Sequence, residues 1–180
     1  PCQIIGDYLT IMEKKKILTG LTLAYVGDAN NNVTHSLLLG CALMGMNIKI
    51  ACPPSKEFLP QPHIMALAKK YAQKTKAKML LTQYPHEAVQ DADVIYTDSY
   101  MSYRIPKSHE KRRIKMLKPY QINPKLMKHA KKTAIFMHCL PAKRGQEVTS
   151  SVLDSKQSVV FDQAENRLHS QKAILLKLLK

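Results

Sequence analysis

The sequence predicts an α/β fold in three layers, with a mainly parallel, doubly wound sheet between two layers of helices. Short apolar runs of strand length alternate along the chain with longer segments whose apolar residues recur at helical spacing. This alternation favours parallel pairing, because each helix returns the chain to the same end of the sheet before the next strand begins. The length of 180 residues is enough for one domain with its own hydrophobic core.

Six short apolar runs are the expected strands. Their length and their content of β-branched and aromatic residues favour strands over helices. Pro141 ends the fifth run, because proline has no N–H group to donate within a sheet. The six runs are residues 21–26, 47–51, 78–82, 93–97, 134–140 and 158–161.

The segments between these runs predict helices. An asparagine near position 31 can cap the second helix, and Asp162 with Glu165 resembles a capping box at the start of the last one. The apolar stripe expected on the last helix is Leu168, Ala173, Ile174, Leu176 and Leu178. The expected helices are residues 1–16, 33–45, 63–74, 86–90, 107–117, a short one from 124, and 163–180.

The chain is strongly basic, with a net charge of +15 from 28 Lys and Arg against 13 Asp and Glu. Most of these basic residues are lysines spread over predicted helix faces, and only residues 107–118 form a dense cluster. There is no tryptophan and no series of aromatic residues on which bases could stack. We therefore expect solvated helix faces rather than a nucleic-acid partner, and a surface that attracts small anions.

Cysteine and histidine usage gives no pattern typical of a metal site. The four cysteines lie far apart without a CxxC pair, and the seven histidines are scattered, so we expect neither zinc nor disulfides. This cysteine usage fits a reducing, cytoplasmic setting. No apolar run is long enough to span a bilayer, so we expect no membrane partner.

Polar or reactive side chains follow four separate strands of the predicted sheet. Because the carboxyl ends of parallel strands meet at one edge, these groups should converge on a single site. Turns and helix caps would explain one or two of them, but not all four. The groups are Asn30–Asn32, Asp98 with Ser102, His138 with Cys139, and Arg167.

These residue types suit a small zwitterion bound beside an anion. The planar guanidinium of Arg167 matches a carboxylate or a phosphate, and Asp98 can hold an ammonium group. Asn32 can bind a carboxylate or an amide. Cys139 can act either as a nucleophile or as a polar contact, and the residues leave both roles open. Together the groups indicate group transfer rather than redox chemistry.

Several of these segments resemble the ornithine carbamoyltransferase family, in order and in spacing. The segments are residues 138–141 (HCLP), 161–167 (FDQAENR), 26–32 (VGDANNN), and Asp98 with Ser102. Residues 1–3 (PCQ) resemble the H-P-C-Q motif of that family without its histidine. The resemblance covers all 180 residues. One departure is residues 102–104, which read Ser-Tyr-Arg where the family usually has Ser-Met-Gly.

The resemblance implies a Rossmann-like domain of the aspartate/ornithine carbamoyltransferase type. It implies transfer of the carbamoyl group of carbamoyl phosphate to the δ-amine of L-ornithine without a cofactor, giving citrulline and phosphate in arginine metabolism. Residues 1–180 would be the ornithine-binding domain of a two-domain, homotrimeric enzyme, with residues 1–16 and 163–180 bridging the domains. The S-T-R-T-R phosphate loop would lie in the other domain. We therefore expect little turnover from this chain alone.

The resemblance also assigns roles to individual residues. The residues assigned to ornithine are Asn32, Asp98, Ser102 and Tyr103. The residues assigned to carbamoyl phosphate are Gln3, Cys139, Leu140 and Arg167. The expected catalytic set is Cys139, Asp98 and Arg167, in which Cys139 would position the δ-amine rather than attack as a nucleophile.

Three alternatives remain open at this point. The chain could belong to a sister transcarbamoylase that acts on putrescine or N-acetylornithine. It could also be a basic nucleic-acid-binding module without enzymatic activity, which salt-dependent retention on DNA would reveal. Finally, it could be the inactive remnant of a decayed gene.

Overall fold

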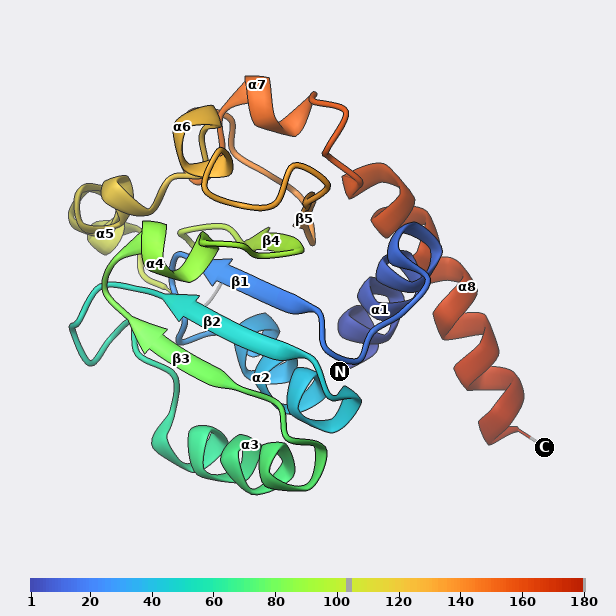
Figure 1. Ribbon diagram of the computed structural model, residues 1–180. Helices are drawn as coiled ribbons and strands as arrows, with labels where there is room; N and C mark the ends of the chain where they lie inside the picture. The colour runs from blue at the N-terminus through green and yellow to red at the C-terminus, as the bar shows by residue number, and fades with distance from the viewer. Residues whose placement is uncertain (103–104, 180) are drawn as a thin grey trace.

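The computed structural model describes residues 1–102 and 105–179, and these residues form one parallel sheet with helices on both faces (Figure 1). The strand order is β3-β2-β1-β4-β5, and all four pairings are parallel. The chain winds outward from β1 in one direction and then, from β4, in the other. The strands are β1 (Thr22–Val26), β2 (Asn47–Ala51), β3 (Met79–Thr82), β4 (Val94–Thr97) and β5 (Ile135–His138).

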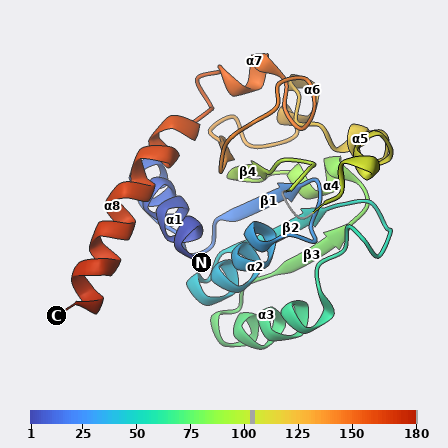
Figure 2. The same cartoon turned by 180° about the vertical axis from the view of Figure 1, so that it is seen from behind.

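Helices cover the sheet in two layers, as expected for a doubly wound fold (Figures 1 and 2). Helices α1, α2 and α3 pack on one face, and α4, α6 and α7 pack on the other. The helices are α1 (Cys2–Lys15), α2 (Asn32–Met44), α3 (Pro62–Thr75), α4 (Pro85–Val89), α5 (Glu110–Leu117), α6 (Pro124–Met127), α7 (Ser150–Leu153) and α8 (Val160–Leu178). Two 3₁₀ turns, η1 (Lys107–His109) and η2 (Lys118–Tyr120), flank α5.

The central strand, β1, shows why the strands are continuous apolar runs in the sequence. Leu23 and Tyr25 of β1 pack into the core beneath α1, α2 and α3, whereas Ala24 and Val26 pack into the core on the opposite face. Successive side chains of a strand point to opposite faces, so a strand covered on both sides is apolar throughout. The predicted α/β fold and its first five strands are confirmed.

The predicted sixth strand at residues 158–161 is wrong. Ser158 makes only an isolated bridge to Phe136, whose N–H donates to the Gln157 carbonyl. The Val159 N–H donates back to the Phe136 carbonyl, and α8 begins at the next residue. A turn in which the Ser158 N–H donates to the Ser155 carbonyl precedes the bridge and leaves too little extended chain for a strand.

The capping box predicted at Asp162 is also wrong. Because α8 begins at Val160, its N-cap is Val159, which has no side-chain oxygen to cap the helix. Asp162 is therefore already inside the first turn of α8, and its Oδ2 lies 2.9 Å from Lys14 Nζ. This ion pair joins the beginning of α8 to the end of α1.

Helices α1 and α8 lie side by side at one end of the sheet and contact each other through polar groups (Figures 1 and 2). Asn166 is buried and donates to Thr10 Oγ1 (3.0 Å) and Glu13 Oε2 (2.7 Å). Gly6 allows this approach, because a Cβ there would lie 3.3 Å from the α8 backbone. The predicted apolar stripe of α8 faces outward instead, and Leu178 is 75% exposed.

Gly40 of α2 offers a test of how tightly α1 packs against α2. A Cβ at this position would lie 2.2 Å from the Tyr8 hydroxyl oxygen and 2.7 Å from Ile4 Cδ1. We expect Gly40→Ala to lower the free energy of unfolding by about 1–3 kcal/mol, although alanine is the better helix former. Urea denaturation measures this change.

A second variant separates crowding from any other effect of the substitution. Tyr8→Phe removes the atom that the new methyl group would meet first, so the double variant Gly40→Ala/Tyr8→Phe should lose less stability than the sum of the two single variants. Strict additivity would contradict the packing that the structure shows.

Candidate functional site

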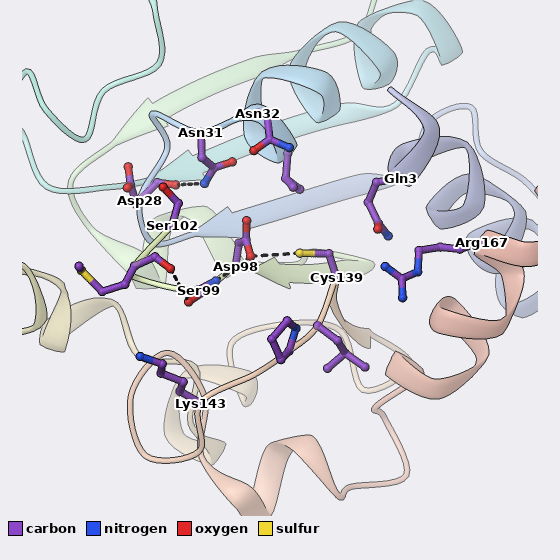
Figure 3. Close-up of a pocket in the computed structure, with 14 residues that line it drawn as sticks. Gln3, Asp28, Asn31, Asn32, Asp98, Ser99, Ser102, Cys139, Lys143 and Arg167 are labelled. Carbon is purple, nitrogen blue, oxygen red and sulfur yellow. Dashed lines mark hydrogen bonds between the residues drawn. The ribbon is translucent and has the colours of Figure 1, made fainter. Parts of the chain in front are cut away.

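A cavity of about 490 Å³ lies at the carboxyl ends of β1, β4 and β5, where the strand order reverses (Figure 3). Open α/β sheets bind ligands at such a point, because loops that leave adjacent strands in opposite directions leave a crevice between them. Residues expected from the sequence that line it are Gln3, Asn32, Asp98, Ser102, Cys139, Leu140 and Arg167. Tyr103 lies outside the described residues.

The turn after β1 places Asn32 at the cavity. Asn31 caps α2 by accepting the Thr34 N–H (2.8 Å), and its own amide donates to the Tyr25 hydroxyl oxygen (2.9 Å). Asn32 is the first residue of the helix and is exposed to the cavity. Asn30, expected at the site, instead donates to the Glu57 carbonyl (3.2 Å) and does not line the cavity.

A buried ion pair between Arg113 and Asp28 holds two loops of the cavity together. Both side chains are buried, and the Arg113 guanidinium also donates to the Tyr100 carbonyl (3.2 Å) and stacks over the Phe58 ring. Burial raises the pKa of Asp28, while the Asn30 N–H and the Arg113 charge oppose that rise. The loop after β1 is thereby fixed to the loop after β4.

The Cys139 thiol donates a hydrogen bond to Asp98 Oδ1 over 3.0 Å. Asp98 Oδ1 also accepts the Ser99 N–H (2.7 Å), which holds the carboxylate in place. Burial raises the pKa of the Cys139 thiol far above its usual range, and the Asp98 charge adds to the rise. A cysteine nucleophile reacts as the thiolate. Of the two roles that the residues left open, this environment therefore favours a polar contact.

His138 supports the site from behind and does not line the cavity, contrary to expectation. Its side chain is wholly buried, with Nδ1 accepting the Leu140 N–H (2.8 Å) and Nε2 lying 3.5 Å from Glu147 Oε1. Leu140 has φ +57°, a left-handed conformation that is costly for a residue with a side chain. The imidazole thus helps to hold the turn that presents Cys139 and Leu140.

Three atoms of types that ligate metals lie within 4.8 Å of one another, one each from Asp98, His138 and Cys139. The sequence predicted that these residues converge but not that they form such a cluster, because they come from the ends of two different strands. In the structure these groups already form hydrogen bonds. Cys139 Sγ donates to Asp98, and His138 Nδ1 accepts the Leu140 N–H.

Charge is distributed unevenly around the cavity. Figure 3 shows Gln3 of α1 and Arg167 of α8 next to each other at one end, with Asp98 between that end and Asp28. Arg167 therefore favours an anion at its own end, and Asp98 favours a cation in the middle. A basic side chain, Lys143, lines another part of the wall.

Several lining residues were missed from the sequence. Asp28 lies in the turn after β1, four residues before Asn32. This closeness in the sequence was the only sign that Asp28 could line the cavity. Lys143 follows the fifth strand by several residues, and only the turn after Pro141 brings it back. Asn31, expected with Asn32, lines the cavity, and the missed lining residues include Asp28, Ser99, Met101 and Lys143.

Comparisons with known proteins agree with this geometry. Residues 19–178 match the family model described as "Aspartate/ornithine carbamoyltransferase, Asp/Orn binding domain". The ornithine carbamoyltransferase of Carboxydothermus hydrogenoformans is 50% identical over 99% of this chain, which corresponds to 56% of that protein. That of Bacillus subtilis is 48% identical over 99% of this chain and 55% of its own length.

Solved structures give the same result. Ornithine carbamoyltransferase from Pyrococcus furiosus superposes with a TM-score of 0.90 at 47% identity, over 97% of this chain and 55% of that one. The chain thus spans about half the length of the curated relatives it matches. The chain belongs to the aspartate/ornithine carbamoyltransferase family, and it carries that family's Asp/Orn binding domain.

Proposed function

We propose that this chain supplies the ornithine-binding part of an ornithine carbamoyltransferase. The observation that carries the proposal is a single cavity in which the Asp98 carboxylate and the Arg167 guanidinium face separate parts of one ligand space. L-ornithine would donate its δ-amine, and carbamoyl phosphate would supply the carbamoyl group. Relatives at about 50% identity are named for ornithine, which favours it over putrescine or N-acetylornithine.

Ornithine would be held by its amino-acid end. Asp98 carries the charge that an α-ammonium group requires, and Asn32 and Ser102 supply polar groups for the α-carboxylate. The δ-amine would then lie beside Cys139, whose protonated thiol orients it without forming a covalent bond. The role of Tyr103, which lies outside the described residues, stays a prediction.

The reaction itself needs a neutral amine and a stabilised leaving group. The lone pair of the δ-amine would attack the carbamoyl carbon, the bond from that carbon to the phosphate oxygen would break, and the proton lost by the amine would end on the departing phosphate. Arg167 would stabilise the charge on the departing phosphate. Holding both substrates in one cavity makes the attack effectively intramolecular, which lowers the barrier.

Leu140 would contribute backbone rather than side chain. Its N–H is already donated to His138, so the backbone group it can offer a ligand is the carbonyl. A carbonyl accepts hydrogen bonds, and the carbamoyl NH₂ group is the donor that carbamoyl phosphate carries at the reacting carbon. Leu140 would therefore bind the carbamoyl end, while Arg167 binds the phosphate.

We further propose that residues 1–180 form one domain of a two-domain, homotrimeric enzyme. An apolar groove runs between α1 and α8, and its lining includes Ile5, Leu9 and Ala173. These helices, at residues 1–16 and 163–180, would contact the carbamoyl-phosphate domain. All four cysteines are free, which supports a cytoplasmic setting. Within the described residues, no helix combines the length and the apolar content needed to cross a membrane.

The first test of the proposed function concerns completeness. We expect the 180-residue chain alone to form little citrulline from ornithine and carbamoyl phosphate, because the phosphate loop of the other domain would be absent. Joining the chain to the first half of the Carboxydothermus hydrogenoformans relative should restore turnover, as a steady-state citrulline assay would show. Full turnover by the chain alone would contradict the two-domain proposal.

The second test concerns Cys139. In the joined enzyme, Cys139→Ser should lower kcat and ornithine affinity about tenfold without abolishing turnover, because one hydrogen-bonding contact is altered and no covalent step is lost. The matched control is Cys2→Ser, since Cys2 is an exposed, free thiol outside the cavity lining. Complete loss of turnover, with folding and ornithine binding unchanged, would instead indicate a nucleophilic cysteine.

A further inference from the structure

Asp7 of α1 is a wholly buried carboxylate that the proposed reaction does not use. It accepts three side-chain hydrogen bonds from three different elements. Gln3 Nε2 and Gln163 Nε2 each donate to Oδ1 over 2.8 Å, and the Tyr96 hydroxyl donates to Oδ2 over 2.9 Å. Two of these donors lead toward the cavity, because Gln3 lines it and Gln163 contacts the strand that ends there.

The charge state of Asp7 determines how the neighbouring side-chain amides are oriented. Burial raises the pKa of Asp7 to about 6, while its hydrogen bonds and the nearby Arg167 charge limit the rise. Near neutral pH the group is therefore mostly ionised, and an ionised carboxylate only accepts hydrogen bonds. The Gln3 amide must then turn its NH₂ group toward Asp7, which leaves Gln3 Oε1 free to accept from a ligand.

The same carboxylate orients a second amide. Because Gln163 gives its NH₂ group to Asp7, its Oε1 is the atom that accepts the His138 N–H over 2.9 Å. That N–H belongs to the residue directly before Cys139. One buried charge thus fixes both an amide at the Arg167 end of the cavity and the backbone that carries Cys139.

We propose that Asp7 is a positioning residue that fixes the Gln3 amide with its oxygen toward the cavity, so that the Arg167 end selects an anion bearing an N–H donor. The inference rests on the proposed function, in which this anion is carbamoyl phosphate. Acetyl phosphate is the informative comparison, because it has the same phosphate but a methyl group in place of the NH₂ group. Inorganic phosphate has neither group and reports on the phosphate contacts without the one to Gln3.

A purely structural role is the alternative, since Asp7 also joins α1 to α8. Asn166 provides the matched control, because it is buried between the same two helices and makes polar contacts to α1 without touching Gln3. Tyr96→Phe is a second control, since it removes one hydrogen bond from the same carboxylate but leaves its link to Gln3 intact.

The first experiment measures the Gln3 amide in the 180-residue chain by NMR near neutral pH. In the wild type, the hydrogen-bonded side-chain amide protons of Gln3 should exchange slowly with solvent. Asp7→Leu should abolish this protection, whereas Asp7→Asn, which keeps an acceptor oxygen, should preserve it, as should Asn166→Ala and Tyr96→Phe. Rapid exchange in the wild type overturns the proposal, and this measurement stands even if Asp7→Leu fails to fold.

The second experiment places the same variants in the joined enzyme and titrates it with carbamoyl phosphate, acetyl phosphate and inorganic phosphate. The wild type should prefer carbamoyl phosphate to acetyl phosphate by more than tenfold, because Gln3 Oε1 and the Leu140 carbonyl would both accept from the NH₂ group. Asp7→Leu should lower that preference about tenfold, the value of the one hydrogen bond to Gln3, without weakening the binding of inorganic phosphate, and Asp7→Asn should preserve the preference. An equal loss of preference in Asn166→Ala would show that the helix contact alone matters and would overturn the proposal.

The two experiments also separate this inference from the proposed function. Slow exchange at Gln3 that depends on Asp7, without any preference for carbamoyl phosphate, would support the orienting role of Asp7 and contradict carbamoyl phosphate as the ligand. A preference for carbamoyl phosphate that Asp7→Leu leaves undiminished would support the proposed function and overturn the role of Asp7.

Discussion

Parallel pairing with a reversal of strand order is the constraint on which the rest of this structure depends. It brings the carboxyl ends of β1, β4 and β5 to one edge and sends the loops after β1 and β4 apart. The space between those loops is the cavity. Helix α2 begins there because Asn31 caps it, and the buried pair of Arg113 with Asp28 ties the two loops together at their base.

The other wall of the cavity depends on a contact between the two ends of the chain. Gln3 lies in the first turn of α1 and Arg167 lies in α8, so they meet only because these helices pack against each other. That contact is polar, with Asn166 and the Asp7 carboxylate buried in it, and Gly6 brings the two backbones close. Polar groups that must pair with specific partners fix a helix in one register more strictly than apolar packing does. The two helices thereby hold Gln3 and Arg167 in fixed positions at the cavity wall.

The sequence could predict features that depend on neighbouring residues, but not contacts between residues that lie far apart in the chain. Alternating apolar runs determine a parallel sheet locally, so five strands and the site edge followed from residues that are close together in the chain. The run at 158–161 was misread, because periodicity alone cannot distinguish a short strand from an apolar helix start. Arg113 was hidden in a basic cluster typical of a solvated face, yet it is buried. Its partner Asp28 lies far away in the sequence, and only the folded chain brings the two together.

His138 and Cys139 show how adjacent residues at the end of one strand come to differ in function. His138 is the last residue of β5 and is wholly buried beside Glu147, whereas Cys139, the first residue after the strand, reaches the cavity and Asp98. The pair therefore cannot act as a thiolate with its own general base, since the imidazole nitrogens face Leu140 and Glu147 rather than the thiol. Instead, Cys139 lines the cavity and His138 supports the turn. The tight turn at Leu140 makes that support necessary, because a left-handed residue needs partners that hold it in place.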